Sequence, residues 1–188
     1  APLQVVIIPI IFKGKEQTVL EACTVLQKKL LQMNIRSSID DREITPGNKY
    51  YDWELKGVPL RVEIGPKDME KNQVTLVRRD LSTKKSVPLT DAEKTIKTEL
   101  QDLEQSLYIK AETLLKENMH SVLTIEEAKQ KTGIVALPWC GNKDCALEIE
   151  NVLEGNTLGE PSENAGWSEH CPVCGSPAKT WMRYAKSY

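Results

Sequence analysis

Apolar positions in the first part of the chain occur in short runs and then at helical spacing. Residues 5–10 read VVIIPI, an uninterrupted apolar run typical of a strand buried on both faces of a sheet. The next apolar positions recur at intervals of four and three, which predicts an amphipathic helix. Its stripe consists of Val19, Cys23, Leu26, Leu30 and Met33. Because Cys23 belongs to this stripe, we expect it to be a packing residue.

Turn and cap residues divide the next part of the chain into further elements. Asn34 is expected to end the first helix, and residues 35–39 are expected to form a second strand. Thr45 and Pro46 predict the N-cap and first position of a second helix, which Gly57 would terminate. Further strands are predicted at residues 60–64, 74–77 and 86–89. Strands alternating with helices in this way indicate a doubly wound α/β sheet.

A longer helix separates this region from a second one. It begins at a capping box, residues 90–93, and its apolar spacing extends it to about Asn118. After His120 a second capping box, residues 124–127, predicts a short helix that closes at Gly133. We therefore predict a domain at residues 1–105 and a second, smaller domain at residues 106–188.

The second domain is predicted to be a small α+β domain. Strands are expected at residues 134–137 and 178–185. Residues 141–170 contain seven acidic residues and one basic residue, and a loop is predicted at residues 154–166.

Composition narrows the classes of function. The formal net charge is −2 and the isoelectric point is about 5.8, so any nucleic-acid surface must be local. No apolar run reaches the roughly 18 residues of a membrane span. No basic and then apolar signal segment is found either. We expect a cytoplasmic protein that binds neither membranes nor DNA.

Four of the five cysteines lie in the last 49 positions, at Cys140, Cys145, Cys171 and Cys174. Two short knuckles, with four and two intervening residues, can supply the four soft thiolates that Zn²⁺ prefers in a tetrahedral site. Four protein ligands leave no position for water, so the predicted zinc is structural. The alternatives are two disulfides or four unrelated thiols, and His170 could replace one cysteine.

Residues 56–85 carry eight basic and four acidic side chains, so this segment is positive within a negative chain. Charge alone favours a solvated sheet edge. A series of motifs in and around this segment changes that interpretation. An ordered series runs through DDR at residues 40–42, PGNKY at 46–50, WELKGVPLRVEIGP at 53–66 and VRRD at 77–80.

This series resembles the anticodon-binding domain of class II aminoacyl-tRNA synthetases, above all that of archaeal and eukaryotic-type prolyl-tRNA synthetases. The resemblance covers essentially the whole chain and extends to the final residue, Tyr188. It implies a five-stranded mixed sheet with flanking helices, followed by a small zinc-binding domain.

The resemblance also implies an enzyme that is larger than this chain. The parent would be a proline–tRNA ligase, a homodimer that joins proline to tRNA with ATP. Its class II catalytic domain, with the ATP and Mg²⁺ sites, would precede Ala1, so we expect a fragment without catalytic residues. The sequence does not assign a role to Tyr188.

The expected partner of the first domain is the anticodon loop of proline tRNA. Every proline codon begins with CC, so the anticodon carries two adjacent guanines. Guanine offers acceptors that suit Arg or Lys and donors that suit a carboxylate, and loop bases can stack on flat side chains. The candidate RNA-binding residues are Arg42, Lys49, Tyr50, Trp53, Glu54, Lys56, Arg61, Glu63, Arg78 and Arg79.

Each candidate has a simpler interpretation. Tyr50 and Trp53 could be core residues, Glu54 could pair with a neighbouring lysine, and Arg61 with Glu63 could form an ordinary ion pair. Two other functions remain open for the whole chain. One is a free-standing, non-catalytic module that binds tRNA or protein with the same fold. The other is a small-molecule domain, although Lys13-Gly14-Lys15 is no phosphate loop.

Overall fold

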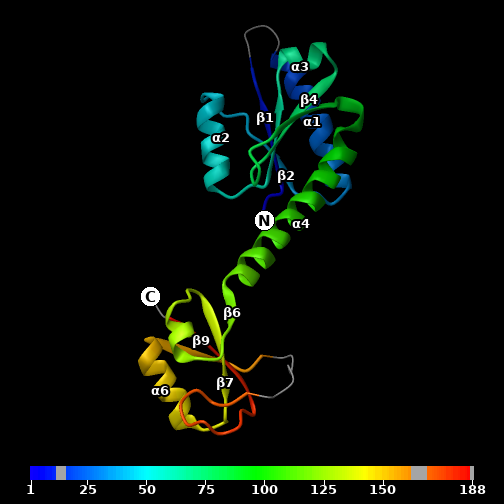
Figure 1. Cartoon of the computed structure of the whole chain (residues 1–188). Helices are drawn as coiled ribbons and strands as arrows, with labels where there is room; N and C mark the ends of the chain where they lie inside the picture. Colours follow the sequence, from blue (N-terminus) through cyan, green and yellow to red (C-terminus); the bar gives the residue numbers. More distant parts are fainter. Residues whose placement is uncertain (12–15, 162–168, 187–188) are drawn as a thin grey trace. The chain divides into compact units, whose positions relative to one another are not determined.

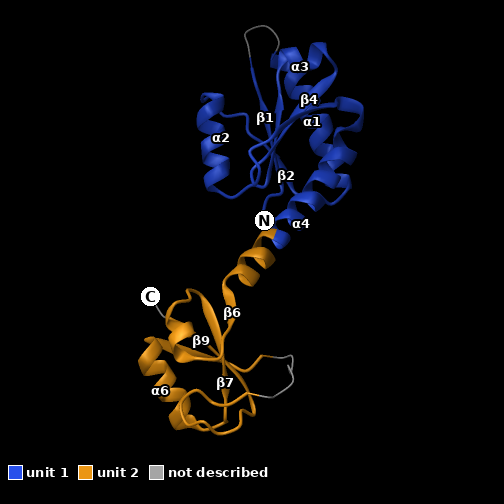
Figure 2. Ribbon diagram, viewed as in Figure 1, with its two compact units in different colours: residues 1–109 blue, residues 110–188 orange. Residues whose placement is uncertain are grey.

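The computed structural model describes residues 1–11, 16–161 and 169–186. The chain forms two compact units, residues 1–109 and 110–188, coloured separately in Figure 2. They meet within one long helix, α4 (Ala92–Glu117). The predicted boundary between residues 105 and 106 stays a prediction. Residues 13–15 and Tyr188 lie outside the described residues.

Unit 1 contains a five-stranded mixed sheet, as the family resemblance implied. Its strands are β1 (Val5–Pro9), β2 (Ser37–Ile39), β3 (Leu60–Ile64), β4 (Gln73–Arg78) and β5 (Lys84–Pro88). Their order in the sheet is β2-β1-β3-β4-β5. Strand β1 runs parallel to β2 and β3, whereas β4 is antiparallel to both β3 and β5.

Helices cover both faces of this sheet (Figure 1). They are α1 (Glu16–Gln32), α2 (Pro46–Leu55), the short α3 (Pro66–Glu70), a 3₁₀ turn η1 (Leu89–Asp91) and α4. The predicted start of α2 is confirmed, because the Thr45 hydroxyl accepts a hydrogen bond from the Asn48 amide at 3.4 Å. Asn34 follows α1 with φ 59°, and Gly57 follows α2 with φ 76°, the left-handed backbone expected where helices end.

The alternation of side chains along β1 gives unit 1 two apolar layers. Val5 and Ile7 pack in the larger core, which includes the predicted stripe of α1 and Ile96 of α4. Val6 and Ile8 point to the other face, where Tyr50 and Trp53 of α2 partly cover them. Cys23 is fully buried in the larger core, as predicted, and burial raises its pKa to about 12.

Unit 2 is built on a four-stranded sheet with the order β6-β7-β9-β8. Its elements are β6 (Met119–Ser121), α5 (Ile125–Lys129), β7 (Ile134–Trp139), α6 (Lys143–Leu153), β8 (Gly155–Gly159) and β9 (Thr180–Lys186). One core lies between this sheet and the two helices, with Leu137, Ile149 and Tyr184 among its most buried members.

The structure differs from the sequence prediction at several elements. The predicted loop at residues 154–166 contains strand β8, which pairs with β9 although glycine and asparagine disfavour strands. Gly155 is required there, because an added Cβ would lie 2.7 Å from the Ala185 carbonyl oxygen. Helix α6 was also missed, since its short apolar stripe lies within the acidic segment. The short elements α3 and β6 had no periodic signal.

None of the helices within the described parts of the chain is sufficiently long and apolar to cross a membrane.

Candidate nucleic-acid interface and metal centre

Asp40, directly after β2, anchors helix α2 to the sheet. Its buried carboxylate accepts hydrogen bonds from Nε and Nη2 of Arg42, at 2.9 and 2.8 Å, and from Trp53 Nε1 at 2.7 Å. The hydrogen bonds from Arg42 are the main reason that the pKa of Asp40 lies well below its usual value. The buried Lys49 ammonium donates to the Asp40 carbonyl oxygen at 2.9 Å. Arg42 also reaches Asp52 at 2.9 Å, so its guanidinium bridges two carboxylates.

A second group of polar side chains lies between α2 and strands β3 and β5. The guanidinium carbon of Arg61 lies 3.9 Å from the centre of the Tyr50 ring. Arg61 also pairs with Glu54 at 2.9 Å and with Glu63 at 3.0 Å. Lys84 on β5 lies 3.4 Å from the second Glu63 oxygen. We refer to Tyr50, Glu54, Arg61, Glu63 and Lys84 as the Tyr50 cluster.

The Tyr50 cluster offers both kinds of hydrogen-bonding group beside an aromatic ring. Arg61 and Glu63 are largely buried, with 9% and 6% of their surfaces exposed, whereas Glu54 and Lys84 are exposed. Burial, followed by the charge of Glu63, raises the pKa of Tyr50 to about 12, so its phenol stays protonated at neutral pH. Donors, acceptors and a flat stacking surface together suit a planar, polar ligand such as a nucleobase.

Three more predicted residues lie at the margin of this cluster. The Lys56 ammonium lies 4.3 Å from the centre of the Trp53 ring, a cation–π distance. Arg79 is exposed at the end of β4 and lines a small hollow with Trp53, Glu54 and Arg61.

Arg78 lies on the opposite face of the sheet. It pairs in register with Leu60 of the larger core, whereas Arg61 pairs with Val77. Its guanidinium contacts Asp80 at 2.7 Å and Glu99 of α4 at 3.4 Å. The hydrogen bond to Asp80 is the main cause of the raised pKa of Arg78.

The ten predicted residues therefore fall into three places. Seven lie in or beside the Tyr50 cluster, and one of these, Trp53, also donates to Asp40. Arg42 and Lys49 bond to Asp40, and Arg78 lies on the opposite face of the sheet. The ion pair between Arg61 and Glu63, the simpler alternative to RNA binding, is present, and Glu54 pairs with Arg61. Their role in RNA binding stays a prediction. Sequence reasoning missed Lys84 as a member of the cluster, since only the pairing of β4 with β5 places it there.

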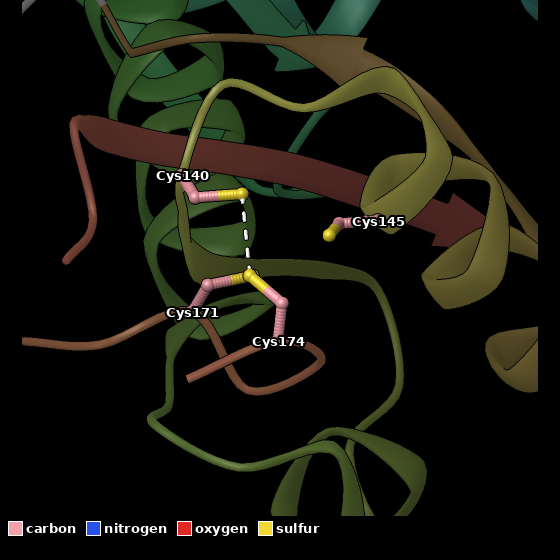
Figure 3. Close-up of side chains that lie close together, drawn as sticks. All are labelled: Cys140, Cys145, Cys171 and Cys174. Carbon is pink, nitrogen blue, oxygen red and sulfur yellow. Dashed lines mark hydrogen bonds between the residues drawn. The ribbon is translucent and has the colours of Figure 1, made fainter. Parts of the chain in front are cut away.

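The four cysteines of unit 2 converge from three segments. Cys140 follows β7, Cys145 lies in the first turn of α6, and Cys171 and Cys174 precede β9. Their sulfur atoms all lie within 4.8 Å of one another, and three of the four side chains are buried. Figure 3 shows the side chains pointing toward a common centre.

The spacing of the sulfur atoms fits a tetrahedral metal site. The Sγ atoms of Cys140 and Cys174 are 3.7 Å apart. A metal–sulfur bond of about 2.3 Å gives tetrahedral edges of about 3.8 Å, whereas a disulfide needs about 2.05 Å. Gly141 and Gly175 follow the cysteines with φ 87° and 69°, which lets each knuckle fold back. The four clustered cysteines are therefore consistent with a structural metal site.

The surroundings of the thiols differ. Hydrogen bonds from the side chain and backbone of Ser176 lower the pKa of Cys174 to about 6. Burial raises the pKa of Cys145 to about 12. A metal would therefore have to displace a tightly held proton from Cys145, while Cys174 already favours the thiolate that binds metal. His170 is exposed and is not a member of the cluster.

Comparison with known proteins assigns both units. Residues 4–99 match the family model "Anticodon binding domain", and residues 122–188 match "Prolyl-tRNA synthetase, C-terminal". Proline–tRNA ligase of Methanosarcina mazei is 39% identical over 191 residues, which cover all of this chain and 40% of the relative. The corresponding ligase of Thermococcus kodakarensis is 41% identical over 196 residues, again over the whole chain and 41% of its own length.

The chain thus spans about 40% of the length of the curated relatives it matches. The family matches agree with the architecture, because the first covers the five-stranded sheet and the second covers most of the unit that holds the cysteines. The chain belongs to the anticodon-binding-domain family, and its two units correspond to the anticodon-binding and C-terminal domains of archaeal-type prolyl-tRNA synthetases.

Proposed function

We propose that unit 1 reads the two adjacent guanines in the anticodon of proline tRNA, and that the Tyr50 cluster makes the reading contacts. The observation that carries this proposal is the stack of Arg61 on Tyr50 between two carboxylates. Membership of the anticodon-binding family supports a tRNA partner, and the chemistry of the cluster supports guanine as the base.

Guanine matches this set of groups at two edges. Its N1–H and N2–H₂ donate to a carboxylate, for which Glu54 and Glu63 are available. Its O6 and N7 atoms accept from a cation, a role for Arg61 or the exposed Lys84. Arg79 and Lys56 at the margin would contact phosphates. Arg42 and Lys49 would act mainly by holding α2 in place, because their charged groups already bond to Asp40.

Binding would exchange partners within the cluster. Arg61 and Glu63 satisfy each other when no RNA is bound, so neither charge is left unpaired in its buried position. A guanine could replace those contacts with its own donors and acceptors, whereas a base with a different pattern would leave a buried charge unpaired. Selectivity would then come from the penalty paid by the wrong base.

The test compares binding of anticodon stem-loops by the wild type, Arg61→Ala and Glu63→Ala. We expect each variant to lose discrimination against loops without the guanines by about 1–3 kcal/mol. Lys29→Ala is the matched control, since it removes one cation from the α1 face, where Lys29 pairs with Glu93. Unchanged discrimination in both cluster variants would reject the assignment.

We also propose that the four cysteines hold one structural Zn²⁺. Four thiolates form the soft donor set that zinc accepts, and no position is left for a reacting water. Cys174→Ser should lower the bound zinc well below one equivalent in metal analysis. Cys23→Ala, which alters the cysteine buried in unit 1, should keep a full equivalent. Equal zinc content in both variants would contradict this site.

The parent activity proposed for the chain is ATP-dependent ligation of proline to tRNA, with a class II catalytic domain and a second subunit as partners. The names of the relatives support this proposal. In a full-length ligase that carries these residues, Arg61→Ala should raise KM for tRNA and leave proline activation by ATP unchanged. Loss of proline activation in that variant would argue against a role confined to the anticodon.

A further inference from the structure

We infer that Glu99 of α4 is a positioning residue for RNA binding: it holds the edge strand β5 so that Lys84 lies beside Glu63 in the Tyr50 cluster. This inference rests on the proposed function of that cluster. Glu99 itself lies on the other face of the sheet, with Arg78, and would not touch RNA.

Strand β5 presents its two consecutive lysines to opposite faces of the sheet. Lys84 pairs in register with Val77, which shares the face of Arg61. Lys85 pairs with Leu76, whose side chain lies in the larger core. Lys84 accordingly reaches Glu63 at 3.4 Å, and Lys85 reaches Glu99 at 2.9 Å. Because the two lysines are adjacent in one strand, a displacement of β5 moves both of them.

Strand β5 has few other attachments. Among the described residues it is an edge strand of its sheet and pairs with β4, and Val87 is the one buried residue within it. Edge strands with so little buried apolar surface open easily from the sheet. A contact from α4 to this strand would therefore have a large effect on where Lys84 lies.

Glu99 is well placed to supply that contact. Its side chain is only 12% exposed, and its two carboxylate oxygens bind different strands, Lys85 on β5 and Arg78 on β4. Arg78 is held in turn by Asp80 at 2.7 Å and by the Ser106 hydroxyl of α4 at 3.1 Å. The Arg78 side chain is 11% exposed, so solvent weakens the Arg78–Glu99 pair less than a surface ion pair. Lys85 is 61% exposed, and its pair with Glu99 is shielded from the Glu99 side alone. Glu99 with Arg78 and Lys85 thus joins α4 to both strands.

A double-mutant cycle on RNA affinity tests this role. Lys84→Ala should weaken binding of the anticodon stem-loop, and Glu99→Gln should weaken it roughly threefold to tenfold without touching RNA. In the Glu99→Gln background, Lys84→Ala should cost at least threefold less than in the wild type, because residues coupled through one strand are not additive. Full additivity of the two substitutions would overturn the inference.

Glu93→Gln is the matched control. Glu93 is another carboxylate of α4, but it pairs with Lys29 of α1 at 3.4 Å. We expect this variant to bind the stem-loop like the wild type and to leave the effect of Lys84→Ala unchanged. A loss equal to that of Glu99→Gln would point to general loosening of α4 and would contradict a specific role for Glu99.

Hydrogen exchange provides a readout without RNA. Amides of residues 84–87 should exchange at least threefold faster in Glu99→Gln than in Glu93→Gln, while those of β1 stay protected in both. If β5 exchanges faster but Lys84→Ala has no effect on RNA binding, the proposed role of Lys84 in RNA binding is wrong, while the role of Glu99 in holding β5 is supported. If Lys84→Ala weakens binding and β5 exchange is unchanged, the positioning role fails.

Discussion

Units 1 and 2 are both sheets covered by helices, but they are stabilised differently. Among the described residues, the larger core of unit 1 contains fifteen buried apolar residues, and α2 covers a second layer on the other face. The core of unit 2 contains eight, and beside it lies a cluster made of cysteines. We therefore expect unit 1 to fold on apolar burial, and unit 2 to require a metal cross-link in addition to its small core.

The two units also differ in where their chemistry is located. In unit 1 the charged side chains of the Tyr50 cluster lie on top of a sheet that is already stable, so they can exchange partners with a ligand. In unit 2 the four thiols converge from three segments of the chain, and we expect a metal held by them to fix the arrangement of these segments. On the proposals above, polar side chains would bind a ligand in unit 1 and hold the fold together in unit 2.

Metal removal should give the largest effect. After chelation, we expect the amide NMR signals of unit 2 to collapse to unfolded positions while those of unit 1 remain dispersed. A structural zinc contributes on the order of 10 kcal/mol to the folding of a small domain, more than a core of this size can replace. If unit 2 kept its dispersed signals without metal, its apolar core would be sufficient for folding. The proposed difference in how the two units are stabilised would then be wrong.

Asp40→Asn should give an intermediate effect, confined to unit 1. At pH 7 we expect the unfolding free energy of unit 1 to fall by about 2 kcal/mol, because the carboxylate accepts charge-assisted hydrogen bonds from Arg42 and a further one from Trp53. The pKa of Asp40 is lowered on folding, so its contribution is present above the unfolded pKa of about 4 and declines as the pH falls below it.

Denaturant unfolding of unit 1 at pH 7 and at pH 3 measures this dependence. The difference in unfolding free energy between the wild type and Asp40→Asn should shrink at pH 3. A difference of equal size at both values would mean that the Asp40 charge does not stabilise α2.

Loss of a helix N-cap should have the smallest effect on the unfolding free energy, and the effect should be of similar size in the two units. Thr45 and Thr124 each accept a hydrogen bond from the amide three residues later, at 3.4 and 3.2 Å. Replacement by Ala should cost about 1 kcal/mol in either unit. The Thr124→Ala loss should be measurable only in the metal-bound protein, since the apo unit 2 is expected to be unfolded. A measurable effect of Thr124→Ala on the unfolding free energy of the chelated protein would contradict the expectation that unit 2 is unfolded without metal.

The sequence predicted unit 1 more completely than unit 2. In unit 1 the apolar stripe of α1, the cap at Thr45 and the turn at Gly57 all act locally, so each left a readable signal. In unit 2, β8 depends on pairing with β9 and α6 lies in an acidic segment, so tertiary contacts decided both. The cysteines were the exception, because metal-ligand spacing is itself a local pattern.

The candidate site was predictable in its residue types but not in its arrangement. Tyr50, Arg61 and Glu63 could be named from a sequence resemblance and from guanine chemistry. That Arg78 faces α4 and Lys84 faces the cluster depends on the register of β3, β4 and β5. A shift of one residue would exchange the faces, and nothing in the charge pattern alone fixes that register.

The central claim is that the Tyr50 cluster reads guanine through a carboxylate. Its most direct test is the affinity of the whole chain for a stem-loop in which either anticodon guanine is replaced by inosine, which lacks the N2 amino group. The wild type should lose about 1–3 kcal/mol at one position at least, and Glu63→Gln should lose much less for the same replacement. Equal losses in the two proteins, or none in the wild type, would contradict the claim.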